Sequence, residues 1–205
     1  MYTILGLLFG TGSPLVVVYS GSMEPVLFRG DVMGLKASNN DLFFGPEVTL
    51  NINLSRTPVS DFATPIYTGN DFSALKLSNG VEVPYEKDGS IVVYTAYNPY
   101  DLAVDTHGKP IIHRAILKIH ANDGTFILTK GDSVANFSFD QDCGPVVYDR
   151  PTKQCISLYP IKTTDIQGVA FFNIPKVGCV KLWLFEDLLS ILGAGKLPKD
   201  FKGIC

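Results

Sequence analysis

The fold of this chain is indicated most clearly by residues 111–129, which read IIHRAILKIHANDGTFILT. Two apolar runs flank the tripeptide Asn122-Asp123-Gly124, and a short turn of this kind between apolar runs is typical of a β-hairpin. The segment therefore predicts two antiparallel strands joined by a tight turn.

The same pattern extends over most of the chain. Apolar runs rich in Val, Ile, Thr, Tyr and Phe, which is strand composition, alternate with turn sequences; they lie at residues 15–19, 48–54, 90–97 and 168–174. The chain has 205 residues, enough to bury a substantial core. We therefore expect a mainly β fold, a coiled antiparallel sheet or partial barrel, with a short helix near the C-terminus.

The polarity of the chain divides it into expected parts. Residues 14–180 are expected to form the β-domain, and the polar stretch at about 34–89, rich in Asn, Ser and Thr, is expected to be a β-rich insertion or subdomain. Residues 1–13 belong to an uncharged segment that Gly10 to Pro14 interrupt, and we expect a short or truncated membrane anchor there. Residues 181–205 continue a helical apolar spacing and predict an amphipathic segment, lying on a membrane or packed on the protein.

Charge and cysteine content exclude several classes of protein. The net charge is −3 and no basic run is present, so a nucleic-acid partner is not expected. No Cys-x-x-Cys spacing occurs, and we expect neither a metal nor another cofactor. Cys143 and Cys155 bracket a loop: a disulfide there would contribute roughly 3 kcal/mol in an oxidising compartment, and two unlinked buried thiols are the alternative.

The candidate chemistry begins directly after the run at residues 15–19, in Ser20-Gly21-Ser22-Met23-Glu24-Pro25. A serine nucleophile needs a firmly held backbone and a nearby base, because a free hydroxyl is scarcely nucleophilic at neutral pH. A strand that leads into a glycine-containing turn can hold a serine in this way. The hexapeptide therefore makes Ser22 a candidate nucleophile.

Four blocks of the chain together resemble type I signal peptidases. Residues 14–25 (PLVVVYSGSMEP) resemble the active-site strand of that family, and Arg29-Gly30-Asp31 resembles its usual continuation. Residues 110–114 (PIIHR) resemble the general-base block of the archaeal and endoplasmic-reticulum branch, which has histidine where bacterial members have lysine. Residues 129–132 (TKGD) resemble the acidic block and residues 166–178 the closing strand pair, whereas the stretch between residues 31 and 110 is unmatched.

The resemblance implies roles for particular residues. Ser22 would be the nucleophile, His113 the general base, and Asp132 the acid that orients the imidazole or balances its charge. The backbone N–H of Ser22 and the hydroxyl of Ser20 would form the oxyanion hole. A second acidic residue usually follows, here Asp140 or Asp142, with Asp140 the closer match; which acid contacts His113 is left open.

The resemblance also implies the setting of the reaction. The substrate would be the signal peptide of a translocated preprotein, cut after small residues by a serine endopeptidase without a cofactor. The expected partners are the lipid membrane and other signal peptidase or translocon subunits, with the catalytic domain on the extracytoplasmic or lumenal side. Asn53-Leu54-Ser55 and Asn136-Phe137-Ser138 match the glycosylation tripeptide, which is too common to indicate modification by itself.

Two other functions are compatible with parts of the sequence. The first is a catalytically silent β-domain that acts as an assembly or binding subunit, and the presence of Ser22, His113 and Asp132 together argues against it. The second is a self-cleaving repressor-like serine protease, which uses a lysine base and usually has a DNA-binding part. This chain has His113 at the base position and shows no such part.

Overall fold

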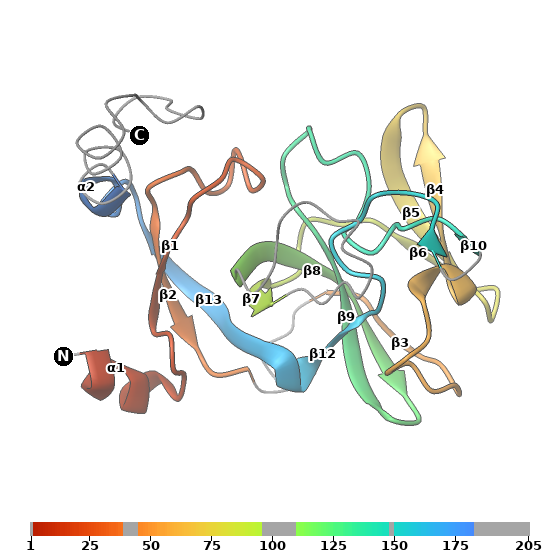
Figure 1. Ribbon diagram of the computed structural model, residues 1–205, viewed down its shortest axis with the longest axis horizontal. Helices are drawn as coiled ribbons and strands as arrows, with labels where there is room; N and C mark the ends of the chain where they lie inside the picture. The colour runs from red at the N-terminus through yellow and green to blue at the C-terminus, as the bar shows by residue number, and fades with distance from the viewer. Residues whose placement is uncertain (1, 39–44, 96–109, 148–149, 183–205) are drawn as a thin grey trace.

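The computed structural model describes residues 2–38, 45–95, 110–147 and 150–182, and strands dominate them (Figure 1). The helices are α1 (Tyr2–Phe9) and α2 (Cys179–Leu182), with short 3₁₀ turns at Val59–Asp61 and Thr163–Asp165. The strands are β1 (Leu15–Val17), β2 (Val32–Lys36), β3 (Glu47–Thr49), β4 (Ala63–Thr68), β5 (Asp71–Leu77), β6 (Glu82–Pro84), β7 (Ile91–Thr95), β8 (Pro110–Ala121), β9 (Gly124–Lys130), β10 (Val146–Val147), β11 (Arg150–Pro151), β12 (Ile161–Lys162) and β13 (Ile166–Ile174).

An eight-stranded sheet forms the body of the molecule. Its order is β1-β2-β13-β7-β8-β9-β12, and β3 joins it by pairing with β8. The pairings along that order are antiparallel, whereas β3 runs parallel to β8. The predicted class, mainly β with antiparallel sheets, is confirmed.

The predicted hairpin at residues 111–129 is confirmed as β8 and β9. Ala121 pairs with Gly124 across the turn, and Gly124 has a φ of 141°, a backbone conformation that side chains with a Cβ rarely adopt. The Asp123 carboxylate accepts backbone N–H groups of Leu54 at 2.8 Å and Ser55 at 2.9 Å. Hydrogen bonds from Ser55 and Leu54 lower the pKa of Asp123 to about 2. The hairpin turn is thereby tied to the stretch at residues 34–89.

That stretch contributes to two sheets. β2 and β3 lie in the main sheet, whereas β4, β5 and β6 form a separate three-stranded sheet, at the opposite end of the molecule from α1 and α2 (Figure 1). Buried side chains of both parts share one apolar cluster, which includes Phe62, Phe72, Leu117 and Phe126. The small sheet is therefore packed on the main sheet, and its status as a separate subdomain stays a prediction.

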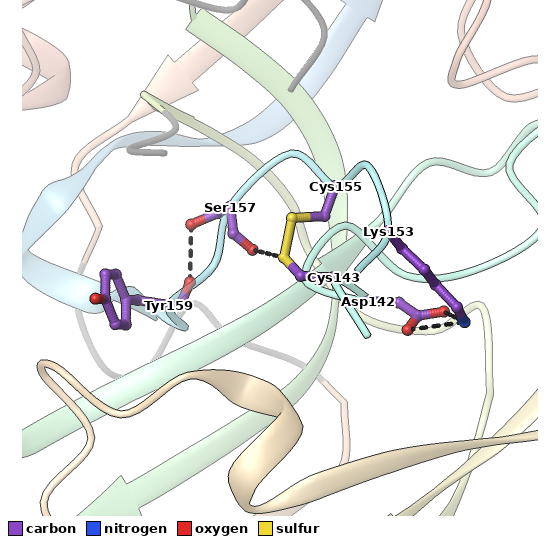
Figure 2. The surroundings of a disulfide bond; sticks show 6 residues. All are labelled: Asp142, Cys143, Lys153, Cys155, Ser157 and Tyr159. Carbon is purple, nitrogen blue, oxygen red and sulfur yellow. Dashed lines mark hydrogen bonds and ion pairs between the residues drawn. A yellow bond between two sulfur atoms is a disulfide. The ribbon is translucent and has the colours of Figure 1, made fainter. Parts of the chain in front are cut away.

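A disulfide joins Cys143 to Cys155 and closes the loop that follows β9 (Figure 2). The carbonyl of Asp140, just before this loop, accepts the N–H of Ile156 at 2.8 Å, just after it. The two ends of the loop are therefore held together beside Asp140.

The two ends of the chain carry the predicted membrane segments. Within the described residues, no helix combines the length and apolar character needed to cross a bilayer. α1 occupies part of the expected anchor at residues 1–13 and exposes Ile4, Leu7 and Leu8. The expected amphipathic segment at residues 181–205 lies outside the described residues from 183 onward, so both segments stay predictions.

Candidate active site

Ser22 lies in a turn at residues 21–24, where the Gly21 carbonyl accepts the N–H of Glu24 at 3.1 Å, within the loop between β1 and β2. The side chains of Val18, before Ser22, and of Met23 and Leu27, after it, are buried in the apolar core, which anchors the loop on both sides. The Asp31 carboxylate accepts the N–H of Phe28 at 3.0 Å and closes the loop before β2 begins. The Ser22 hydroxyl lies 3.1 Å from the Ser20 hydroxyl, so the two serines proposed for the reaction are in direct contact.

His113 extends from the first third of β8, with 4% of its surface exposed. Its Nδ1 lies 2.7 Å from Oδ2 of Asp140, which is buried as well. Burial, the largest single influence, raises the pKa of Asp140. The charge of His113 and the hydrogen bonds from His113, Thr129 and Tyr94 together lower this pKa by more, so that its net value is below the usual one. An ionised carboxylate only accepts hydrogen bonds; Nδ1 therefore carries a proton and Nε2 is left to accept one.

Asp140 is held by a chain of buried polar side chains. The Tyr94 hydroxyl donates to Asp140 Oδ2 at 2.8 Å and lies 2.9 Å from the Thr129 hydroxyl. The Gln141 side-chain N–H donates to the Thr129 hydroxyl at 3.0 Å, and the Gln141 side-chain oxygen accepts the backbone N–H of Thr129. Burial raises the pKa of Tyr94 well above its ordinary value, so the phenol remains a donor. These contacts fix the carboxylate that faces His113.

Asp132 contacts Arg114 and not His113. The Arg114 guanidinium donates to both carboxylate oxygens, with Nε 2.9 Å from Oδ1 and Nη2 2.6 Å from Oδ2, and Nη1 donates to the Gly89 carbonyl at 2.7 Å. Successive residues of a strand point to opposite faces, so the side chains of His113 and Arg114 leave β8 in different directions. The question of which acid contacts the imidazole, left open by the sequence, is answered by Asp140; a role for Asp132 in balancing the charge of His113 stays a prediction.

Asp142, the other candidate for the second acid, has partners other than His113. Its carboxylate accepts the Tyr67 hydroxyl at 2.8 Å and pairs with Lys153 Nζ at 3.2 Å, beside the disulfide (Figure 2). These contacts tie the small sheet to the disulfide loop, and they leave Asp140 as the acid in contact with the imidazole.

Ser22 and His113 approach each other at Gly131. A Cβ on Gly131 would lie 2.6 Å from the Ser22 carbonyl oxygen, closer than real side-chain atoms come, and in a tight contact of 3.0 Å with His113 Nε2. Within the described residues, the Ser22 hydroxyl bonds to Ser20 and makes no hydrogen bond with His113. Such catalytic contacts are often long before a substrate binds. The imidazole nitrogen that can accept a proton thus lies beside the backbone of Ser22.

Comparisons with known proteins show what the whole chain is similar to. No family model matches the chain. The chain is 26% identical over 184 residues to the signal peptidase complex catalytic subunit SEC11 of Scheffersomyces stipitis, which covers 90% of this chain and 73% of that protein. The SEC11 subunits of Clavispora lusitaniae (28% over 186 residues; 90% and 73%) and Lachancea thermotolerans (27% over 192 residues; 92% and 76%) are also similar. The resemblance to signal peptidases of the endoplasmic-reticulum and archaeal branch is confirmed.

Sequence reasoning missed several residues that surround this signal-peptidase-like site. Tyr94 was hidden in a run interpreted only as a strand, and Asn136 appeared only in a glycosylation tripeptide. Lys130 stands inside the TKGD block, but its importance depends on its burial, which cannot be read from the sequence. Tyr85 lies nearby: burial and the charge of Asp132 raise its pKa to about 12.

Proposed function

We propose that this chain is the catalytic subunit of a signal peptidase, a serine endopeptidase that removes signal peptides from translocated preproteins after small residues. The observation that carries the proposal is the buried His113–Asp140 pair, whose free Nε2 adjoins Ser22 at Gly131. The similarity to the SEC11 subunits supports the substrate class.

The proposed reaction requires that substrate binding bring Ser22 Oγ within hydrogen-bond distance of His113 Nε2. Ser22 Oγ attacks the scissile carbonyl carbon while His113 Nε2 takes its proton, and Asp140 stabilises the resulting imidazolium. The Ser22 N–H and the Ser20 hydroxyl donate to the oxyanion. The C–N bond then breaks, and Nε2 protonates the leaving amine. Water hydrolyses the acyl-enzyme by the same steps, with His113 again as base.

The proposed setting is the membrane across which preproteins are translocated. The domain would lie on its extracytoplasmic or lumenal side, because a signal peptide is cut after translocation. The SEC11 relatives are subunits of a complex, and we extend that association to this chain. Preprotein signal peptides, lipid and other subunits of the complex are the proposed partners.

The test is cleavage of a preprotein by wild type and by two serine variants. Ser22→Ala should abolish cleavage because it removes the attacking oxygen. Ser20→Ala, the matched control in the same loop, should lower kcat by about 10²–10³ because it removes one oxyanion donor. Substantial cleavage by a correctly folded Ser22→Ala protein would exclude the serine mechanism, and an inert wild type in its complete complex would favour the silent assembly subunit.

A further inference from the structure

The carbonyl of Ser22 is held by the loop that follows β9. It accepts the backbone N–H of Ser133 at 2.9 Å and the side-chain amide of Asn136, also at 2.9 Å. Two donors on one carbonyl fix the peptide plane that follows Ser22. Because that plane sets the direction of the Cα–Cβ bond, the loop determines where the Ser22 hydroxyl can point.

A buried lysine holds both ends of this loop. Lys130 Nζ donates to the carbonyls of Gly131 at 3.0 Å and Asn136 at 2.6 Å, and it lies 5.5 Å from the centre of the Tyr85 ring. Burial lowers the pKa of Lys130, and the nearby Asp140 carboxylate counteracts that change. A buried ammonium is costly unless it is hydrogen-bonded. Its two carbonyl contacts therefore favour the folded form of the loop.

The space around the loop leaves little room for movement. A Cβ on Gly131 would lie 2.0 Å from Asn136 Nδ2, in addition to its contacts with Ser22 and His113. The Asn136 amide, the Ser22 carbonyl and His113 Nε2 therefore surround one point at which only glycine fits. A shift of Asn136 would change the position of Ser22 relative to its base.

We infer that Asn136 is a positioning residue for the nucleophile, with Lys130 holding its loop in place. The inference rests on the proposed function, since it concerns the reactivity of Ser22. Displacement of a reacting group by about 1 Å can cost about a hundredfold in rate. Loss of the Asn136 amide is therefore expected to lower kcat while leaving KM for the preprotein unchanged.

Two variants separate this role from glycosylation of the same tripeptide. Asn136→Asp keeps the shape of the side chain and, when ionised, loses the donor. Ser138→Ala removes the glycosylation tripeptide and keeps the Asn136 amide. Tyr67, which loses its hydrogen bond to the Ser138 hydroxyl, retains the one to Asp142. Only the first variant should impair the reaction.

The experiment measures kcat and KM for a preprotein and the rate at which a fluorophosphonate labels Ser22. Asn136→Asp should lower kcat and the labelling rate in parallel, by about 10- to 100-fold, with KM unchanged. Ser138→Ala should match wild type in kcat, KM and labelling rate. Equal labelling of wild type and Asn136→Asp would overturn the positioning role alone. A wild type that neither cleaves nor reacts would overturn the proposed function, and this inference with it.

The other glycosylation tripeptide has the opposite surroundings. Asn53 is exposed, and within the described residues its side-chain amide makes no hydrogen bond. Asn136 is partly buried and donates to Ser22. A glycan on Asn53 would extend into solvent, whereas one on Asn136 would displace the contact with Ser22. The two matching tripeptides are therefore not equivalent.

The geometry points to Asn53 as an acceptor of an N-linked glycan, provided that the domain has the proposed lumenal or extracytoplasmic location. The donor would be a lipid-linked oligosaccharide. A bond forms between Asn53 Nδ2 and the anomeric carbon, the lipid pyrophosphate leaves, and the amide gives up one proton. Ser55, which completes the tripeptide, is exposed as well.

The test compares gel mobility before and after endoglycosidase treatment for the full chain from its own membrane. Wild type should carry one glycan and Asn53→Gln none. Val81→Thr is the matched control, because it completes a new tripeptide at Asn79, in an exposed turn. A glycan on Val81→Thr but none on wild type would overturn the assignment to Asn53 alone. No glycan on either would overturn the proposed location together with the assignment.

Discussion

His113 and Arg114 are neighbours on β8 and each pairs with a buried carboxylate, yet the two pairs differ in kind. His113 makes a single contact with Asp140, and its other ring nitrogen is free to exchange a proton beside Ser22. Arg114 donates to Asp132 through Nε and Nη2 and to the Gly89 carbonyl through Nη1. The first pair leaves a nitrogen available to chemistry, whereas the second satisfies its charges within the protein.

The difference shows how one strand can supply both a reactive and a structural charge. Arginine stays protonated at any physiological pH, and its planar fork fits a carboxylate. Its hydrogen bonds to Asp132 raise the pKa of Arg114 further. The Arg114–Asp132 pair, with the Gly89 contact, thus joins β8, the loop after β9 and the turn before β7 into one unit. Three experiments test whether the two pairs are as distinct as their contacts indicate.

The largest expected effect is on catalysis by Asp140→Asn. An asparagine amide can donate to Nδ1 and so favour the tautomer that is protonated at Nε2, which cannot act as a base. We expect kcat to fall by about 10⁴. Asp132→Asn, the matched control, should lower kcat by less than about tenfold, equivalent to about 1.4 kcal/mol. The measurement is kcat of both variants on one preprotein. A larger loss of kcat in Asp132→Asn than in Asp140→Asn would identify Asp132 as the orienting acid.

A smaller effect is expected on stability from Arg114→Met. This change leaves the buried Asp132 carboxylate without its cation, and loss of one partner of a buried pair typically costs about 3–5 kcal/mol in the free energy of unfolding. Urea denaturation measures the loss. The double variant Arg114→Met with Asp132→Leu should recover part of it, because no unpaired charge then remains. If Arg114→Met alone were as stable as wild type, the Arg114–Asp132 pair would not be structural.

The smallest effect is the contribution of Asp140 to acid stability. A carboxyl group whose pKa is lower in the folded protein stabilises it above the unfolded-state pKa of about 3.9, and this contribution is lost as the pH falls through the folded-state value. Between roughly pH 5 and pH 2, wild type should therefore lose more free energy of unfolding than Asp140→Asn. Parallel pH profiles for the two proteins would contradict the lowered pKa.

The strands were predictable from local sequence, because composition and turn residues determine them over short distances. The β8–β9 hairpin and the strands near residues 91 and 166 were found in this way. The partner of His113 was not, because Asp132 and Asp140 lie on a loop whose path depends on distant contacts. The Asp140 N–H donates to the Thr129 carbonyl, and the Cys143–Cys155 disulfide closes the chain just beyond. Neither contact can be predicted from the spacing of Asp132 and Asp140 in the sequence.

The separation in sequence between Ser22 and Asn136, 114 residues, has a consequence for the life of the newly made chain. A ribosome produces the turn with Ser22 early, and it adds the imidazole, its carboxylate and the amide that orients the serine much later. Until then the serine is an ordinary alcohol. Under the proposed function, the emerging polypeptide cannot cleave its neighbours until these residues have been made, so the order of translation delays the onset of proteolysis.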